Sequence, residues 1–125
     1  MKADIKIKWL AALRSGLFKQ TQSTLFRAKG DVIKRYLTDE HPRIVEEDCY
    51  CCLGVLCKVL GLGFIAPNGR QYLQDSSGSI TGCWAGLSDE AMQKADIHDT
   101  MRLVGMNDND GADFNEIAEY IDENF

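Results

Sequence analysis

The sequence predicts a single α+β domain over residues 1–125, built around one buried helix. Residues 49–60, CYCCLGVLCKVL, form the most apolar run and carry one charge, Lys58. Helical spacing of apolar residues marks both ends of the chain, whereas residues 64–84 are rich in Gly, Ser, Asn and Pro. A chain of this length buries about two thirds of its unfolded surface, enough for one core. We expect N- and C-terminal helices to pack on the central helix beside a small antiparallel sheet or hairpins.

The first expected element is a helix that ends near Gly16, a residue suited to the position after a helix C-terminus. Asp4 is its N-cap candidate. The apolar face of this helix consists of Ile5, Trp9, Ala12 and Leu13.

Residues 17–27 alternate approximately between apolar and polar side chains, which predicts a strand. Gly30 ends that pattern. Residues 31–48 are polar and contain Pro42, so we expect a loop, or a second short strand at about Val32–Leu37.

The central helix is predicted by two apolar rows with the spacing i, i+4, i+7. These rows are Cys52, Leu56 and Val59, and Leu53, Cys57 and Leu60. Gly61 and Gly63 should end the helix.

Residues 64–84 predict an irregular hairpin with its tip near Asp75–Gly78. Helices are expected at Asp89–Ala95, capped by Ser88, and at about Asp99–Val104. A capping box of Asp113 and Glu116 should begin the last helix. Its buried face would consist of Phe114, Ile117, Ala118 and Ile121.

Charge is divided along the chain, although the net charge is only −5. Residues 1–35 carry nine Lys and Arg against two acids, whereas residues 84–125 carry two against eleven. Two solvated faces would explain this division, as would an anion-binding first third or an acidic surface for a basic partner. Opposite charges would also permit homo-oligomers.

We expect a cytoplasmic protein without membrane association. No apolar run approaches the roughly 18 residues of a membrane span. The first residues lack the apolar segment of a secretion signal. Five cysteines, an odd number concentrated in a core-like segment, suit free thiols in a reducing compartment.

Metal and thiol chemistry have weak support in the sequence. Cys49 and Cys52 form a C-x-x-C pair, and Cys57, Cys83 or His98 could supply the remaining ligands of a zinc site. The second close pair of ligands that is typical of such sites is missing. A nucleophilic Cys51 or Cys57 would need His41 or His98 as a basic neighbour, and nothing ties these histidines to the helix. Residues 107–111, NDNDG, fail the EF-hand register because Ile117 would occupy the position of the bidentate acid. We therefore expect no metal and no cofactor.

A basic turn offers the stronger site. Arg14 stands at the end of the first helix, where it could bond the last carbonyls, or it could join Lys19 and Arg27 in holding an anion. The candidate ligand-binding residues are Arg14, Ser15, Lys19, Gln20, Thr21, Arg27, Tyr50, Tyr72 and Trp84.

Three blocks covering about half the chain resemble a family of small proteins from phages and prophages. They are W-x-x-A-L-R-S-G at residues 9–16, followed by Gln20, then Y-C-C-L-G-V-L-C at residues 50–57, and M-N-D-x-x-G-x-x-F-x-x-I-A-x-x-I at residues 106–121. Cys49 and Cys83 fall outside these blocks. The segment at about Lys29–Asp48 is longer than is usual in the family. The resemblance implies a setting, phage infection, rather than an activity.

In that setting we expect a non-enzymatic binder that acts on a host process, such as a counter-defence protein that sequesters a nucleotide signal. The turn Arg14–Thr21 would meet phosphates, while Tyr50, Tyr72 or Trp84 would stack on a base. One alternative is an acidic inhibitor of a host protein that imitates nucleic acid. Another is a small enzyme that degrades a nucleotide signal, and a third is a structural phage component. Direct nucleic-acid binding is disfavoured by the acidic balance.

Overall fold

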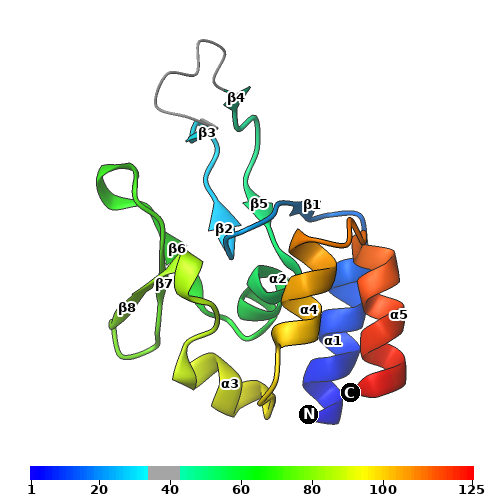
Figure 1. The fold of residues 1–125 in the computed structure, drawn as a ribbon. Coiled ribbons are helices and arrows are strands. Elements are labelled where there is room, and N and C mark those ends of the chain that lie inside the picture. The colour runs from blue at the N-terminus through cyan, green and yellow to red at the C-terminus, as the bar shows by residue number, and fades with distance from the viewer. Residues whose placement is uncertain (34–42) are drawn as a thin grey trace.

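A computed structural model describes residues 1–33 and 43–125. Its helices and small sheets form the α+β domain that the sequence predicts (Figure 1). The helices are α1 (Ala3–Arg14), α2 (Cys52–Val59), α3 (Asp89–Ala95), α4 (Met101–Asp108) and α5 (Phe114–Asn124). The strands are β1 (Lys19–Gln20), β2 (Phe26–Arg27), β3 (Val32–Ile33), β4 (Arg43–Ile44), β5 (Cys49–Tyr50), β6 (Gly63–Ile65), β7 (Tyr72–Gln74) and β8 (Ile80–Gly82).

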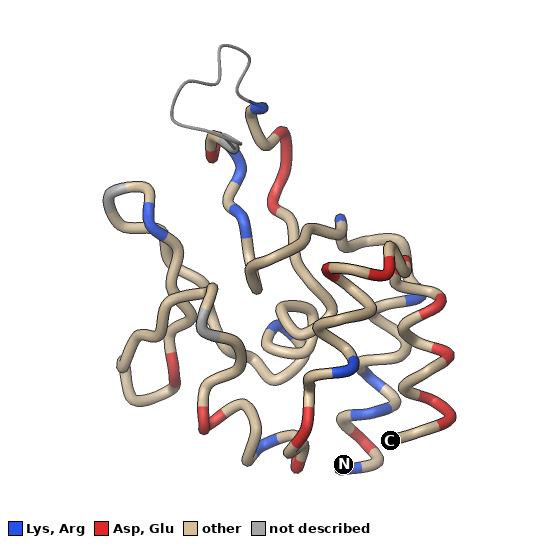
Figure 2. Tube along the Cα trace, viewed as in Figure 1, with Lys and Arg blue, Asp and Glu red and all other residues tan. Residues whose placement is uncertain are grey.

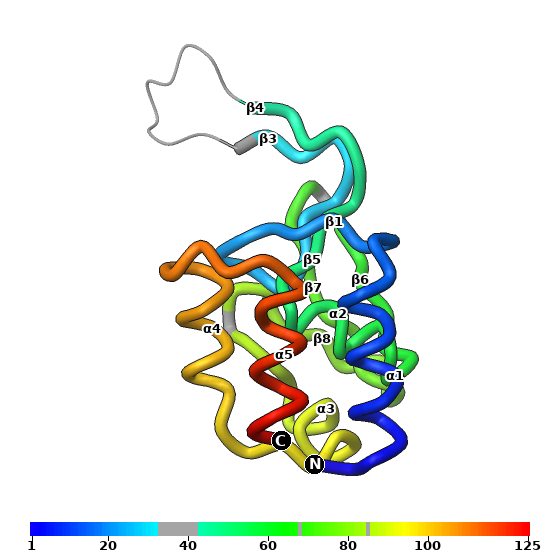
Figure 3. The backbone as a smooth tube through the Cα atoms, turned by 90° about the vertical axis from the view of Figure 1, so that its right-hand side faces the viewer, coloured from blue at the N-terminus to red at the C-terminus, as the bar shows by residue number. Residues whose placement is uncertain are grey.

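Helix α2 is the centre of the core, as expected. Helix α1 packs against α2 and α5, and α4 packs against the same two helices (Figures 1 and 3). All residues from Cys52 to Cys57 are buried, including Gly54, which has no side chain. The largest fully buried side chains around it include Trp9, Leu103, Ile117 and Ile121. None of the helices in the described ranges is long and apolar enough to cross a membrane.

The central helix begins at Cys52, where its apolar rows begin, rather than at Cys49, where the apolar run begins. Cys49 and Tyr50 form β5, and Cys51 is an extended N-cap whose Sγ accepts a hydrogen bond from the N–H of Gly54. The apolar run therefore divides into a strand and a helix, because β5 finds pairing partners on both sides. Gly61, at φ +81°, follows the helix end as expected.

The expected strand over residues 17–27 is instead two short strands joined by a turn. Strand β1 pairs in parallel with β5, whereas β2 pairs with the opposite edge of β5 in the antiparallel direction. The chain must turn around between them, and Ser23 adopts a φ of +68° in this turn. Only tertiary pairing could reveal this division.

Two further sheets complete the fold. Strands β3 and β4 pair at the end of an arm that projects from the body (Figure 3). The expected strand Val32–Leu37 is present at Val32–Ile33, and its remainder lies outside the described residues, as does His41. Strands β6, β7 and β8 form an antiparallel meander, and the tip between β7 and β8 lies at residues 75–79, where the sequence placed it.

The caps of the late helices match their sequence signals. Ser88 Oγ accepts from the N–H of Ala91, and Asp113 and Glu116 form the capping box. At α1, Lys2 takes the N-cap position and the predicted cap Asp4 lies in the first turn. Helix α4 extends to Asp108, so the polar run at residues 107–111 begins inside a helix rather than in a turn.

Candidate functional site

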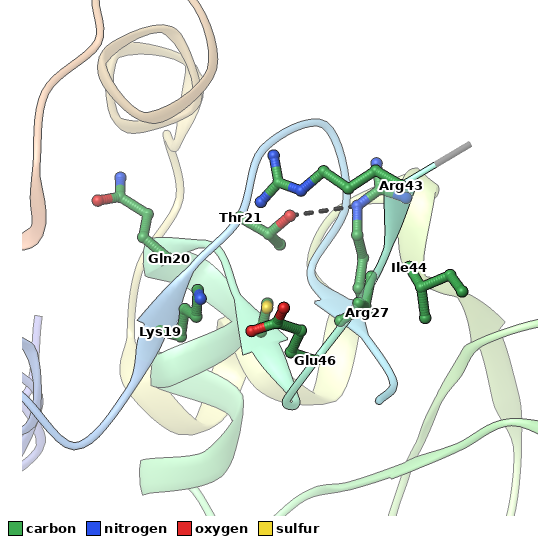
Figure 4. Close-up of a pocket in the computed structure, with 9 residues that line it drawn as sticks. Lys19, Gln20, Thr21, Arg27, Arg43, Ile44 and Glu46 are labelled. Atoms are coloured by element: carbon green, nitrogen blue, oxygen red, sulfur yellow. Dashed lines mark hydrogen bonds between the residues drawn. The ribbon is translucent and has the colours of Figure 1, made fainter. Parts of the chain in front are cut away.

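Three cationic side chains from different strands line one hollow of about 200 Å³, named here the basic hollow. They are Lys19 of β1, Arg27 of β2 and Arg43 of β4 (Figure 4). A second hollow of about 570 Å³ shares Arg27 and Arg43 and continues to Gly111–Asp113. The lining of the basic hollow consists of Lys19, Gln20, Thr21, Arg27, Arg43, Ile44, Val45, Glu46 and Cys49.

The register of the first sheet explains why two of these cations meet. Cys49 of β5 is the partner of Lys19 on one side and of Arg27 on the other. Paired residues on neighbouring strands direct their side chains to the same face of a sheet. Lys19 and Arg27 therefore flank Cys49 in one row, although eight positions separate them in the sequence.

Arg27 is held in place by its neighbours. Its Nε donates to Thr21 Oγ1 at 3.1 Å, and its Nη2 donates to the carbonyl of Gln22 at 3.4 Å. Asp31 lies 3.8 Å away as an ion partner, and the Arg27 side chain is only 24% exposed. A guanidinium fixed in this way loses little conformational freedom on binding an anion.

The other two cations are held more loosely. Lys19 Nζ lies 3.8 Å from Glu47 in a pair that is about half exposed, and such pairs contribute only about 0–1 kcal/mol. Arg43 is exposed, and within the described ranges no hydrogen bond or ion pair involves its side chain. Figure 2 shows Lys and Arg on the strands around the hollow together with acids in the segment between β4 and β5, and further acids along α5. The side chains that could reorient toward an anion are therefore Lys19 and Arg43.

The thiols nearby are protonated core groups. Burial raises the pKa of the Cys49 thiol, and the positive charges of Lys19 and Arg43 oppose this shift. Burial also raises the pKa of Cys51 to about 11 and that of Cys83 to about 12. His98 is exposed and pairs with Asp96. In the part of the chain that is described, no group of three or more His, Cys, Asp or Glu residues could hold a metal ion.

Among the predicted ligand-binding residues, the structure brings Lys19, Gln20, Thr21 and Arg27 together. Gln20 nevertheless points away from the cations (Figure 4), because its amide donates to Asn107 Oδ1 and to the carbonyl of Ala112, each at 2.9 Å. Its side chain is therefore engaged in holding the fold, while Thr21 positions Arg27.

Arg14 and Ser15 lie elsewhere. Arg14 forms an ion pair with Asp122 of α5 at 3.8 Å, and Ser15 Oγ donates to the carbonyl of Ala12. The basic turn expected at residues 14–21 is thus divided: its first half packs toward α5, and its second half lines the hollow.

The three candidate stacking aromatics differ in accessibility. Tyr50 is half-buried in a cluster with Phe18, Phe26 and Phe64, its ring centroid 5.3 Å from those of Phe18 and Phe26. Tyr72 is half-buried in β7. Trp84 is 71% exposed, so it presents the most open ring of the three.

Sequence reasoning missed two important residues. Arg43 stands in a segment for which the sequence predicts a loop or a short strand, and nothing local connects it with Lys19 and Arg27. Asn107 lies in a polar run, yet it is buried and bonds four partners. Its Oδ1 accepts from Gln20 Nε2 and from the N–H of Cys52, and its Nδ2 donates to the carbonyl of Thr21 and to Asp108 Oδ1.

The three sequence blocks at residues 9–16, 50–57 and 106–121 meet one another in the core. Trp9 Nε1 donates to the carbonyl of Cys52 at 2.9 Å, which joins the first block to the second. The N–H of Cys52 donates to Asn107, which joins the second block to the third. These residues therefore define the architecture on which the basic hollow is built.

Comparison with known proteins identifies a family without an assigned activity. No curated protein and no solved structure matches the chain. The model of the family described as "Domain of unknown function (DUF8296)" matches residues 1–125, and the chain belongs to this family.

Proposed function

We propose that this protein is a non-enzymatic binder that holds a small phosphate-bearing ligand in the basic hollow. The observation that carries the proposal is the convergence of Lys19, Arg27 and Arg43 on one hollow. The planar fork of Arg suits phosphate oxygens, and bonds in which both partners are charged are about twice as strong as neutral ones.

Electrostatics favour occupation by an anion. Arg27 and Arg43 line both adjoining hollows, and like charges near each other repel. Glu46 in the lining and the ion partners Asp31 and Glu47 offset this repulsion in part. The Lys19–Glu47 pair contributes little because it is 3.8 Å long and about half exposed. A phosphate group would lie among all three cations.

The resemblance of three sequence blocks to phage proteins supports a proposal for the biological setting. We propose that the protein acts in the host cytoplasm as a counter-defence factor and withdraws a nucleotide signal from circulation. The described lining of the basic hollow contains one carboxylate, Glu46, and no histidine, which supports binding over catalysis.

The acidic-inhibitor alternative has less support. Several acids of the C-terminal third are engaged within the chain: Asp108 accepts from the N–H of Ser23, Asp110 pairs with Arg102, and Asp122 pairs with Arg14. A surface that imitates nucleic acid would instead present its charges to a partner.

The test is depletion of a bacterial nucleotide extract by the purified protein, read by mass spectrometry. We expect one or a few phosphorylated compounds to leave the solution and to return intact after heat denaturation. The return of a converted product would identify an enzyme and contradict the proposal.

Two variants locate the site. Arg43→Ala removes an exposed cation of the hollow and should abolish depletion. Arg14→Ala is the matched control, because Arg14 pairs with Asp122 away from the hollow and its loss should leave depletion unchanged. Equal loss in both variants, or no depletion by the unmodified protein, would overturn the proposal.

A further inference from the structure

We propose that Trp84 and the hollow beside it form a base-binding subsite, so that the ligand is a nucleotide rather than a phosphate compound in general. This inference rests on the proposed function, since it assigns the second half of the same ligand. The two tryptophans of the chain are in opposite environments: Trp9 is 0% exposed and Trp84 is 71% exposed.

One side of the exposed Trp84 ring packs against Gly82. A Cβ added at Gly82 would lie 2.4 Å from both Cη2 and Cζ3 of the Trp84 ring. The absence of a side chain at Gly82 therefore lets the ring rest against the backbone of β8. An aromatic ring held in this way offers a stacking surface at a small cost in conformational entropy.

The hollow beside Trp84 combines the aromatic ring with two arginines, one carboxylate and polar side chains. Its volume is about 340 Å³, and we name it the Trp84 hollow. Its lining consists of Thr24, Arg27, Asp31, Arg70, Gln71, Cys83 and Trp84. A base could stack its apolar face on Trp84 and bond the polar groups around the ring through its edge, so the mixed apolar and polar lining suits a nucleotide.

Arg27 connects this hollow with the basic hollow, because its side chain lines both. The backbone fixes the two in relation to each other. The N–H of Leu25 donates to the carbonyl of Cys83 at 3.1 Å, so the residue before β2 is bonded to the residue before Trp84. A ligand with its phosphates between Arg27 and Arg43 can therefore extend past Arg27 to place a ring on Trp84.

The Trp84 subsite is tested by comparing ligands with and without a base. The probes are the four ribonucleoside diphosphates and inorganic pyrophosphate, titrated calorimetrically into the full chain. Tryptophan fluorescence gives a second readout, because a ligand can stack on the exposed Trp84 but cannot reach the buried Trp9. We expect at least one nucleoside diphosphate to bind more tightly than pyrophosphate and to quench the emission of Trp84.

Variants separate the two subsites. Trp84→Ala should weaken nucleotide binding by about 10- to 100-fold and leave pyrophosphate binding unchanged, as expected for loss of one base–aromatic stack. Trp84→Phe should retain most of the affinity. Ile80→Ala, at an exposed apolar residue of the preceding strand β8, should change neither. Arg43→Ala should weaken both ligands.

The outcomes distinguish this inference from the proposed function. If pyrophosphate and the nucleotides bind equally and Trp84→Ala changes nothing, the anion site stands and the base subsite is wrong. If no probe binds, both fail, and the exposed Trp84 is then better explained as a contact for a protein partner.

Discussion

Gln20 and Asn107, 87 positions apart, are joined by a hydrogen bond of 2.9 Å from Gln20 Nε2 to Asn107 Oδ1. The same oxygen accepts from the N–H of Cys52 at the start of α2, and the Asn107 amide donates to the carbonyl of Thr21 beside β1. One buried amide thus joins α4, α2 and the strand that carries Lys19. It couples the stability of the core to the geometry of the basic hollow.

Asn107→Ala should destabilise the protein by about 2–4 kcal/mol. The substitution leaves the N–H of Cys52 and the carbonyl of Thr21 without their partner, and each unsatisfied buried group costs about 1–3 kcal/mol. Urea denaturation measures the effect. Asn109→Ala, at the exposed end of α4, is the control and should change stability by less than about 0.5 kcal/mol. Similar values for both variants would show that the network is not stabilising.

Gly54→Ala should be destabilising, in contrast to the usual gain from replacing a helical glycine. A Cβ at Gly54 would lie 2.0 Å from the carbonyl oxygen of Leu25, which also accepts from the N–H of Cys51. Overpacking of this kind costs about 1–3 kcal/mol. Thermal unfolding followed by circular dichroism checks this outcome.

The control for that substitution lies in α4. A Cβ at Gly105 would meet nothing within 4 Å, so Gly105→Ala should stabilise the helix by about 0.5–1 kcal/mol. A melting temperature that falls equally in both variants would contradict the steric explanation.

Stability should fall as pH rises above 9. In the unfolded chain the thiols titrate near their ordinary pKa of 9.0, whereas burial raises the pKa of Cys51 to about 11 and that of Cys83 to about 12 in the folded protein. Between these values the unfolded state releases protons that the folded state retains, so ionisation favours unfolding. The contribution is fully present below pH 9 and is lost as pH rises through the folded pKa values.

Urea midpoints measured from pH 8 to pH 11 test this dependence, and Cys83→Ala should show a shallower decline. All five cysteines are buried, so a thiol reagent at pH 8 should modify them only after denaturant is added. Rapid modification of the native protein would refute the protonated-core description.

Asp31→Asn should tighten pyrophosphate binding by about two- to fivefold, because it removes the carboxylate that competes for Arg27. The substitution keeps an oxygen that can accept from the N–H of Val32, as Asp31 Oδ1 does. Equilibrium dialysis measures the affinity. Glu119→Gln on α5 removes the same charge away from the hollow and should have no effect. Weaker binding by Asp31→Asn would contradict the description of Asp31 as a competitor for Arg27 and would indicate that it positions the guanidinium instead.

The candidate site could be predicted only in part. The sequence indicates Lys19, Thr21 and Arg27 as anion ligands because basic and polar side chains gather near one turn, and these residues line one hollow in the structure. Arg14 belongs to the same sequence cluster but pairs with Asp122. The chain turns at Gly16, which separates Arg14 from the other members of the cluster. Arg43 joins the hollow through the arm of β3 and β4, and no local pattern indicates where that arm lies.

The sequence by itself determined the α+β class, the buried helix α2 and the signals that bound the late helices. These depend on interactions over one to four positions: apolar spacing, the cap at Ser88, the box of Asp113 and Glu116, and the glycine after α2. Only the tertiary structure decided the strands, the cationic row around Cys49 and the role of Asn107. A strand of two residues has no periodicity to read and is held by partners distant in the chain, so its position is set by what packs beside it.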